Sequence, residues 1–144
     1  MNAALLAALN APVLHHVGIV VGSEKQALAQ MLRLGLKEHY RGHVAAWDVL
    51  CIFAHGNGGS PLEFVVPLSA GPLRDFNKGL GGLHHLAFAV PDLFEATARL
   101  AAMGVNMLEP QPVKGAGPFL CNFIPPLFTR AYAVELVQLL PAVE

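Results

Sequence analysis

Two short stretches of this 144-residue chain decide its fold: His15-His16-Val17-Gly18-Ile19-Val20-Val21 and His84-His85-Leu86-Ala87-Phe88-Ala89-Val90. Each begins with a pair of histidines and continues as an apolar run rich in β-branched or aromatic residues. Such a run is typical of a buried strand. Because the pattern occurs twice, it predicts an internal repeat, in which one supersecondary unit is built two times.

A helix is predicted after each of these strands, since capping residues and helical apolar spacing follow both. Each helix starts at a good N-cap residue and ends at a glycine suited to the left-handed C′ position. These residues are Ser23 and Gly35 in the first copy, and Asp92 and Gly104 in the second. Each glycine lies 19 residues after the second histidine of its copy, and this equal spacing supports a true repeat.

Three further strands are predicted in each copy, which gives both the order β-α-β-β-β. Turn signals rich in Gly and Pro separate them, and one of these predicted turns is at Gly42. The expected strands are 36–40, 47–54 and 62–66 in the first copy, and 105–109, 119–124 and 132–139 in the second. The sequence therefore predicts an α+β fold, with one domain over 14–138 made of repeats 14–67 and 83–138. Residues 1–13 are expected to add an N-terminal helical extension.

The composition narrows the classes of function. Apolar residues make up 54% of the chain and charged residues only 13%, with a formal net charge of −1. A charged fraction near 25% is usual. These values exclude a disordered chain, a coiled coil and a polybasic nucleic-acid binder, and predict no attraction to anionic membranes. Because the chain has so few charged residues, some apolar side chains are expected to remain on its surface. Self-association would cover this apolar surface, so a homodimer is expected.

The cysteines and the N-terminus predict a cytoplasmic protein. Cys51 and Cys121 lie inside apolar runs without CxxC spacing, which is typical of reduced core residues. No Lys or Arg precedes the apolar stretch at 1–12, so a signal peptide is not expected. No apolar stretch reaches the length of a membrane span.

Four residues at matching places in the two copies point to a metal site. Glu63 and Glu135 each lie in the last strand of their copy, inside an apolar run without Lys or Arg. A carboxylate buried there costs several kcal/mol unless it is paired or binds a metal. His16 and His85 occupy the first strands of the same two copies. Two imidazoles and two carboxylates suit a divalent Mn, Fe, Co, Ni or Zn ion.

Taken one at a time, these residues have structural alternatives. A histidine at a strand start often caps or packs, and a glutamate in a strand can face solvent at an edge. The agreement of all four across the repeat favours the metal site over these alternatives. Strand alternation turns the neighbouring His15 and His84 to the other face, so they are expected to be exposed or to support the ligands. The remaining histidines, His39, His43 and His55, lie near loops and are expected at the surface.

The chain resembles the vicinal oxygen chelate superfamily, which includes glyoxalase I, bleomycin-resistance proteins and extradiol dioxygenases, and within it the methylmalonyl-CoA epimerase branch. Besides the two histidine strands, the resemblance is carried by Pro61–Leu68, Gly81–Gly82, Gly115–Gly117 and Val134–Gln138. It covers about residues 14–138.

The resemblance implies that His16, Glu63, His85 and Glu135 hold one divalent metal ion, Co, Ni, Mn, Fe or Zn, inside a cupped mixed sheet. It also implies an epimerase or isomerase that moves a proton at the carbon next to a carbonyl through a metal-stabilised enolate. The resemblance also implies a small-molecule substrate, for which an acyl-CoA thioester is one candidate. Asp48 lies in the strand where epimerases of the family carry an acidic base, and Glu135 is the other catalytic candidate.

The segment before Glu135 departs from the epimerase pattern and keeps other functions open. Residues 125–132, Pro-Pro-Leu-Phe-Thr-Arg-Ala-Tyr, lack the lysine and the glycine pair usual in that branch. A glyoxalase I-like lyase would use the same ligands. An extradiol-type dioxygenase, a non-catalytic small-molecule-binding protein of the same fold and a protein-interaction module are the further alternatives.

Overall fold

Both predicted helices begin at their predicted N-cap residues, and the predicted glycine with positive φ follows the end of each, directly after the last residue of the first helix and after the C-cap Met103 in the second helix. The hydroxyl of Ser23 accepts a hydrogen bond from the backbone N–H of Gln26 at 3.2 Å, and Gly35 closes the helix with φ 71°. The carboxylate of Asp92 accepts from two backbone N–H groups in the first turn of the second helix. These local hydrogen bonds satisfy groups that a helix end leaves without partners.

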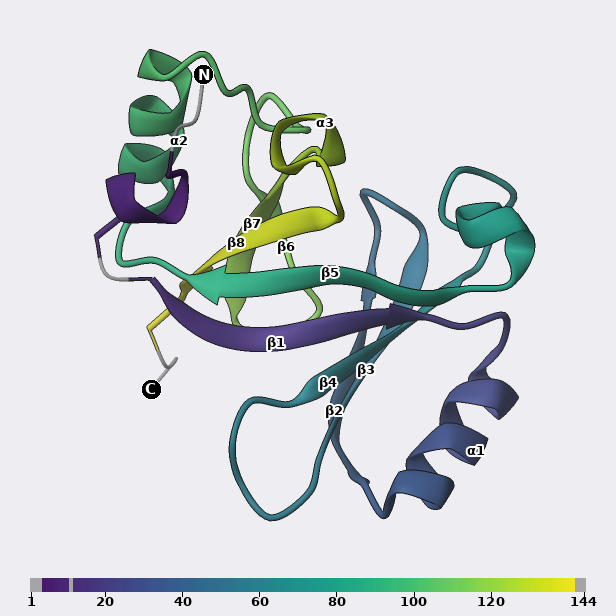
Figure 1. Cartoon of the computed structure of the whole chain (residues 1–144). Coiled ribbons are helices and arrows are strands. Elements are labelled where there is room, and N and C mark those ends of the chain that lie inside the picture. Colours follow the sequence, from purple (N-terminus) through teal and green to yellow (C-terminus); the bar gives the residue numbers. More distant parts are fainter. Residues whose placement is uncertain (1–3, 11, 142–144) are drawn as a thin grey trace. The chain divides into compact units, whose positions relative to one another are not determined.

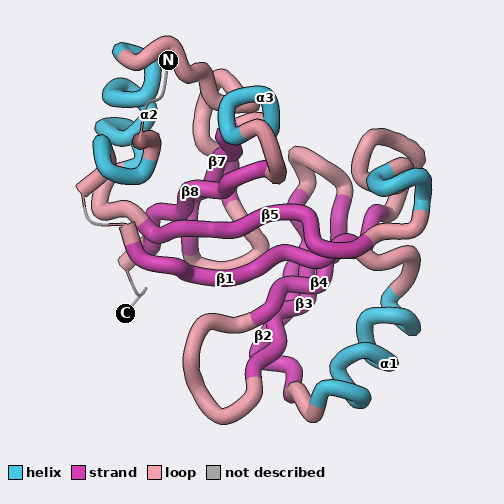
Figure 2. The backbone as a smooth tube through the Cα atoms, viewed as in Figure 1, coloured by secondary structure: helices cyan, strands magenta, loops and turns pink. Residues whose placement is uncertain are grey.

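The computed structural model describes residues 4–10 and 12–141 and confirms the α+β fold with two β-α-β-β-β units (Figures 1 and 2). No helix among the described residues is long and apolar enough to cross a membrane. The helices are η1 (Leu6–Ala8), α1 (Glu24–Leu34), η2 (Phe76–Gly79), α2 (Leu93–Ala102) and α3 (Pro126–Thr129). The strands are β1 (Val13–Val20), β2 (Lys37–Val44), β3 (Val49–His55), β4 (Leu62–Pro67), β5 (Gly82–Ala89), β6 (Val113–Lys114), β7 (Phe119–Ile124) and β8 (Ala133–Leu139).

The chain divides into two compact units. The first-repeat unit consists of His16–His85 with Gly115–Gly117, and the second-repeat unit of Met1–His15, Leu86–Lys114 and Pro118–Glu144. The predicted limits of a single domain over 14–138 stay a prediction.

The first-repeat unit has a mixed sheet in the order β2-β3-β4-β1, covered on one face by α1. Strand β1 is parallel to β4, and β3 is antiparallel to both of its neighbours. The core on the α1 side is formed by buried apolar residues of the helix and the strands, Val21, Ala27, Met31, Ile52, Ala54, Phe64 and Val66. Because side chains alternate along a strand, the residues between these face the other side of the sheet.

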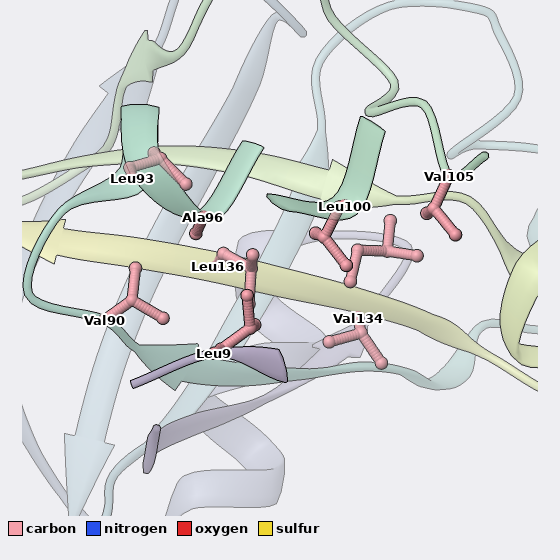
Figure 3. Close-up of a cluster of buried hydrophobic side chains, with 9 residues drawn as sticks. Leu9, Val90, Leu93, Ala96, Leu100, Val105, Val134 and Leu136 are labelled. Atoms are coloured by element: carbon pink, nitrogen blue, oxygen red, sulfur yellow. The ribbon is translucent and has the colours of Figure 1, made fainter. Parts of the chain in front are cut away.

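The second-repeat unit packs α2 over its strands in the order β5-β8-β7-β6. Figure 3 shows its core, in which Leu93, Ala96 and Leu100 of α2 meet Val134 and Leu136 of β8. Leu9 of the N-terminal extension is buried in the same core. The helical part of that extension is only the three-residue 3-10 helix η1, and residues 1–3 and 11 lie outside the described residues.

The strand expected at 36–40 is longer than predicted and runs through Gly42. The turn follows instead over residues 45–48, directly before β3. A Cβ added at Gly42 would lie 2.3 Å from the carbonyl oxygen of Ala116. The glycine therefore serves the close approach of another backbone segment, not a turn.

The prediction of a strand at 105–109 is wrong, since this segment forms no ladder of backbone hydrogen bonds with a neighbouring strand. The strand that pairs with β7 on this side is instead the two-residue β6. One backbone hydrogen bond ties it to β7, from Leu108 N–H to the carbonyl of Phe123 at 2.8 Å. The buried amide of Asn122 makes two further hydrogen bonds to this segment. Its oxygen accepts from Glu109 N–H at 3.0 Å, and its NH₂ donates to the Glu109 carbonyl at 2.9 Å. The side chain of Asn122 thus makes hydrogen bonds that a paired strand would otherwise make to the backbone of Glu109.

Replacing Asn122 by Ala is expected to destabilise the protein by roughly 2–3 kcal/mol, because it leaves the backbone groups of Glu109 without their side-chain partner. Urea unfolding at neutral pH measures this loss. Asn122→Asp keeps the acceptor but buries a carboxylate that faces the Glu109 carbonyl, so at neutral pH it should be no more stable than the Ala variant. An Ala variant as stable as the wild type would show that water replaces the amide.

Candidate metal centre

Three of the four predicted ligands come together in the first-repeat unit. His16, Glu63 and His85 are each buried, with exposed fractions of 0%, 5% and 4%. Oε1 of Glu63 lies 3.2 Å from Nε2 of His85 and 3.6 Å from Nε2 of His16. The two Nε2 atoms are 3.3 Å apart. Among the described residues this is the one group of three or more His, Cys, Asp or Glu side chains close enough to hold an ion.

The cluster lies on the sheet face opposite α1, and the strand register explains why. Gly18 and Phe53 are the neighbours of Glu63 in register, on β1 and β3. Cross-strand partners project to the same face. Phe53 is fully buried and meets the ring of His16 edge-on at 5.1 Å, while Tyr40 stacks on Phe53 at 4.6 Å. Aromatic side chains therefore form an apolar wall beside the ligands.

The spacing of the three donor atoms fits one divalent cation. Donors about 2.1 Å from a shared ion, at angles between about 90° and 110°, lie about 3.0–3.4 Å from one another. The observed separations of 3.2, 3.3 and 3.6 Å are close to this range. Two imidazoles and one carboxylate suit first-row divalent metals. These residues could therefore hold the predicted ion.

The carboxylate of Glu63 is the charged member of the cluster. Burial alone would raise the pKa of Glu63, but the hydrogen bonds and positive fields of the two imidazoles outweigh it, so the pKa lies below its usual value. Glu63 is therefore ionised at neutral pH. A buried anion beside two nitrogen donors attracts a cation.

The imidazole of His84 contacts the imidazole of His85. The Nδ1 atoms of the two neighbouring imidazoles are 2.8 Å apart. An imidazole that presents its Nε2 lone pair to a cation carries its hydrogen on Nδ1, so with an ion bound Nδ1 of His85 would donate and Nδ1 of His84 would accept. Burial, and then the charge of His85, lowers the pKa of His84 to about 4, so its ring is neutral at neutral pH. His84 thus contacts a predicted ligand, and its supporting role stays a prediction.

In the metal-free protein, His84 is expected to make stability depend on pH between about 6.5 and 4. Its pKa is about 4 in the folded state and 6.5 as the reference value, so the unfolded chain binds more protons in this window. Stability should fall as pH falls, by roughly 2–3 kcal/mol between pH 7 and pH 4. His84→Gln should flatten this part of the curve, measured by urea unfolding at several pH values. Equal pH slopes for the two proteins would contradict the assignment.

Glu135, the fourth predicted ligand, occupies the equivalent place in the second-repeat unit. It is 3% exposed and lies opposite Phe123 in the β7–β8 register, just as Glu63 lies opposite Phe53. The cysteines follow the same register, with Cys51 opposite Val65 and Cys121 opposite Val137. Both cysteines are buried and are not joined in a disulfide, in keeping with their prediction as core residues.

Asp48, the predicted base, is not part of the cluster. It lies in the turn before β3 with φ 47°, and its half-exposed carboxylate accepts a hydrogen bond from Nε2 of His43 at 2.9 Å. That bond, with one from Ser69, lowers the pKa of Asp48. His43 is the register partner of Leu50, which packs against the core on the α1 side. Asp48 is thus hydrogen-bonded to His43, which lies on the α1 side of the sheet, whereas Glu63 lies on the other side.

Comparison with known proteins finds the same fold and family. Residues 15–123 match the Glyoxalase/Bleomycin resistance protein/Dioxygenase superfamily. The chain is 34% identical over 128 residues to the uncharacterized protein YqjC of Bacillus subtilis (strain 168), covering 87% of this chain and 91% of that protein.

Two solved structures are similar over nearly the whole chain. A hypothetical protein from Bacillus halodurans C-125 has a TM-score of 0.81 at 28% identity, covering 94% of this chain and 99% of that one. The methylmalonyl-CoA epimerase from Mycobacterium tuberculosis has a TM-score of 0.82 at 25% identity, covering 90% and 89%. With well over half of its length matched, the chain belongs to the glyoxalase/bleomycin resistance protein/dioxygenase superfamily.

Proposed function

We propose that this protein is a divalent-metal-dependent epimerase or isomerase that moves a proton at the carbon next to a carbonyl, on an acyl-CoA thioester such as methylmalonyl-CoA. The observation that carries the proposal is the buried cluster of His16, Glu63 and His85, with donor separations of 3.2–3.6 Å. The similarity to the Mycobacterium tuberculosis epimerase supports the type of reaction.

The residues of the first-repeat unit would hold the ion and exclude water. His16 and His85 offer nitrogen donors, and the ionised Glu63 would offset one positive charge of the ion. A bound divalent ion supplies Lewis acidity, which stabilises negative charge developing on a carbonyl oxygen. Phe53 and Tyr40 line the same face with apolar surface, and exclusion of water strengthens the electrostatic interactions there.

The proposed proton carrier is Glu135, which we also propose as the fourth ligand. The support is its equivalence to Glu63 in sequence, burial and strand register. A buried carboxylate can remove a proton from carbon when its pKa is matched to the task, and epimerisation then requires that a proton is delivered to the opposite face of that carbon. Asp48 is the weaker candidate base, because its carboxylate is engaged by His43 on the α1 side of the sheet.

The test is solvent-deuterium uptake into methylmalonyl-CoA, followed by proton NMR in D₂O. Protein loaded with cobalt, nickel, manganese, iron or zinc should exchange the proton at the substituted carbon with at least one of these ions, and chelator-treated protein should not. An absence of uptake with every ion would refute the epimerase proposal. Turnover of the hemithioacetal of methylglyoxal and glutathione in the same panel would point to the glyoxalase I-like lyase.

The donor set also favours a second candidate, an iron(II) dioxygenase. Two histidines and one carboxylate with open positions hold non-haem iron in many oxygenases, and the cluster of the first-repeat unit has this composition. Oxygen consumption by iron-loaded protein with catechol substrates would support this function. A requirement for Glu135 in metal binding would count against it, because a fourth protein ligand fills a position that oxygen chemistry needs.

A further inference from the structure

We propose that Gly18 is a positioning residue for the metal ligand His85, because its missing side chain leaves the space that the imidazole occupies. This inference rests on the proposed metal site and adds to it a residue of the first-repeat unit that is itself no ligand. It concerns two residues 67 positions apart in sequence.

The ring of His85 lies directly against the backbone of β1 at Gly18. A Cβ built at this position would be 2.0 Å from Cε1 of His85 and 2.4 Å from both ring nitrogens. Real Cβ atoms essentially never approach other heavy atoms to less than 3.0 Å. Any side chain at position 18 therefore takes the place of the ring.

The need for space beside the backbone, and not a special backbone conformation, explains why position 18 is a glycine. Gly18 lies inside β1 and is not among the glycines with positive φ, so other residues could adopt its backbone conformation. Glycine weakens a strand interior, and where it occurs there it often marks the close approach of another group. At Gly18 that group is the imidazole of His85.

The ring of His85 cannot move without leaving the site. Its Nε2 lies 3.2 Å from Glu63 and 3.3 Å from His16, and its Nδ1 lies 2.8 Å from His84. Gly18 is also the register partner of Glu63, so a ring lying over Gly18 is beside the carboxylate. A methyl group at position 18 would push the ring away from all three partners.

Because a side-chain ring can yield more easily than a backbone, the Gly18→Ala protein should fold while its ligand set is disrupted. We expect Gly18→Ala to lower cobalt affinity by roughly 10- to 100-fold, the range seen when residues that orient a metal ligand are changed. The measurement is a Co²⁺ titration followed by the visible absorption of the bound ion. Gly56→Ala is the matched control, because a Cβ there would meet only Leu36 at 3.9 Å.

A double-mutant cycle separates positioning from general damage. If Gly18 acts through His85, Gly18→Ala should have no further effect on cobalt affinity in a His85→Ala protein. If Gly18→Ala alone fails to fold, the pair Gly18→Ala/His85→Ala should fold, since the space is then free. An equal loss of affinity in both backgrounds would overturn the inference.

Histidine-ring NMR of the metal-free protein tests the position of His85 without any ion. Gly18→Ala should shift the ring signals of His85 and leave those of His39 and His55 in place. Unchanged His85 signals, together with wild-type cobalt affinity, would overturn the inference. Wild-type protein that binds no ion would refute the proposed metal function instead, while the ring signals still report whether Gly18 positions His85.

Discussion

Glu63→Ala is expected to abolish metal binding, with a loss of affinity of at least about 100-fold and of any metal-dependent turnover. The substitution removes the single anion of the cluster, whose Oε1 is within 3.6 Å of both imidazole nitrogens. A charge-bearing ligand contributes more than a neutral one to holding a divalent cation, because it offsets the cost of removing the ion from water.

Elemental analysis and thermal unfolding measure this outcome together. An ion at 100 times its dissociation constant stabilises a folded protein by about 2.7 kcal/mol, which corresponds to roughly 10 °C in Tm for a chain of this size. Wild-type protein should show about one ion per chain and this shift, and Glu63→Ala should show neither. Glu24→Ala removes an exposed carboxylate of α1 that pairs with Arg41, so it should behave like the wild type. One ion per chain in Glu63→Ala would place metal binding elsewhere.

Glu135→Gln is expected to separate proton transfer from metal binding. The amide keeps an oxygen donor of similar shape but cannot take up a proton from carbon. Deuterium uptake should fall by roughly 10²- to 10⁴-fold, the usual contribution of a general base, while the ion stays bound with weaker affinity. The combination of lost exchange and retained metal is specific to a base.

The matched control for Glu135→Gln is Glu95→Gln on α2. Glu95 belongs to the same unit but forms an exposed pair with Arg99, its side chain being 54% exposed. It should lose no activity, since exposed pairs contribute little to stability. Wild-type exchange in Glu135→Gln would move the role of the base to another residue, and Asp48→Asn would then be the next variant to measure.

Features set by neighbouring residues could be predicted from the sequence. Ser23 and Asp92 cap their helices as expected, because N-capping needs only a side-chain oxygen and the N–H groups two or three positions later. The strand periodicity indicated which glutamates are buried, and the repeat predicted one site of His16, Glu63, His85 and Glu135, of which the first three lie together. Their separations of 3.2–3.6 Å fit that expectation.

The segments that were mispredicted have partners far away in the chain. Gly42 signalled a turn, yet the backbone of Ala116, 74 positions later, uses the space beside it. Residues 105–109 have strand-like composition, but Asn122 satisfies the backbone of Glu109 through its side chain. The local sequence pattern of a segment does not indicate which group elsewhere in the chain will contact its backbone or form hydrogen bonds with it.

The sequence by itself determined the repeat, the helix ends, the α+β class and the types of donor at the candidate metal site, because these follow from periodicity, capping chemistry and the cost of burying a carboxylate. Only the tertiary structure decided that the ring of His85 lies on Gly18, that His84 contacts it, and that Asp48 is bound to His43 away from Glu63. These three facts depend on where side chains project from paired strands. Register and distance, not composition, fix that.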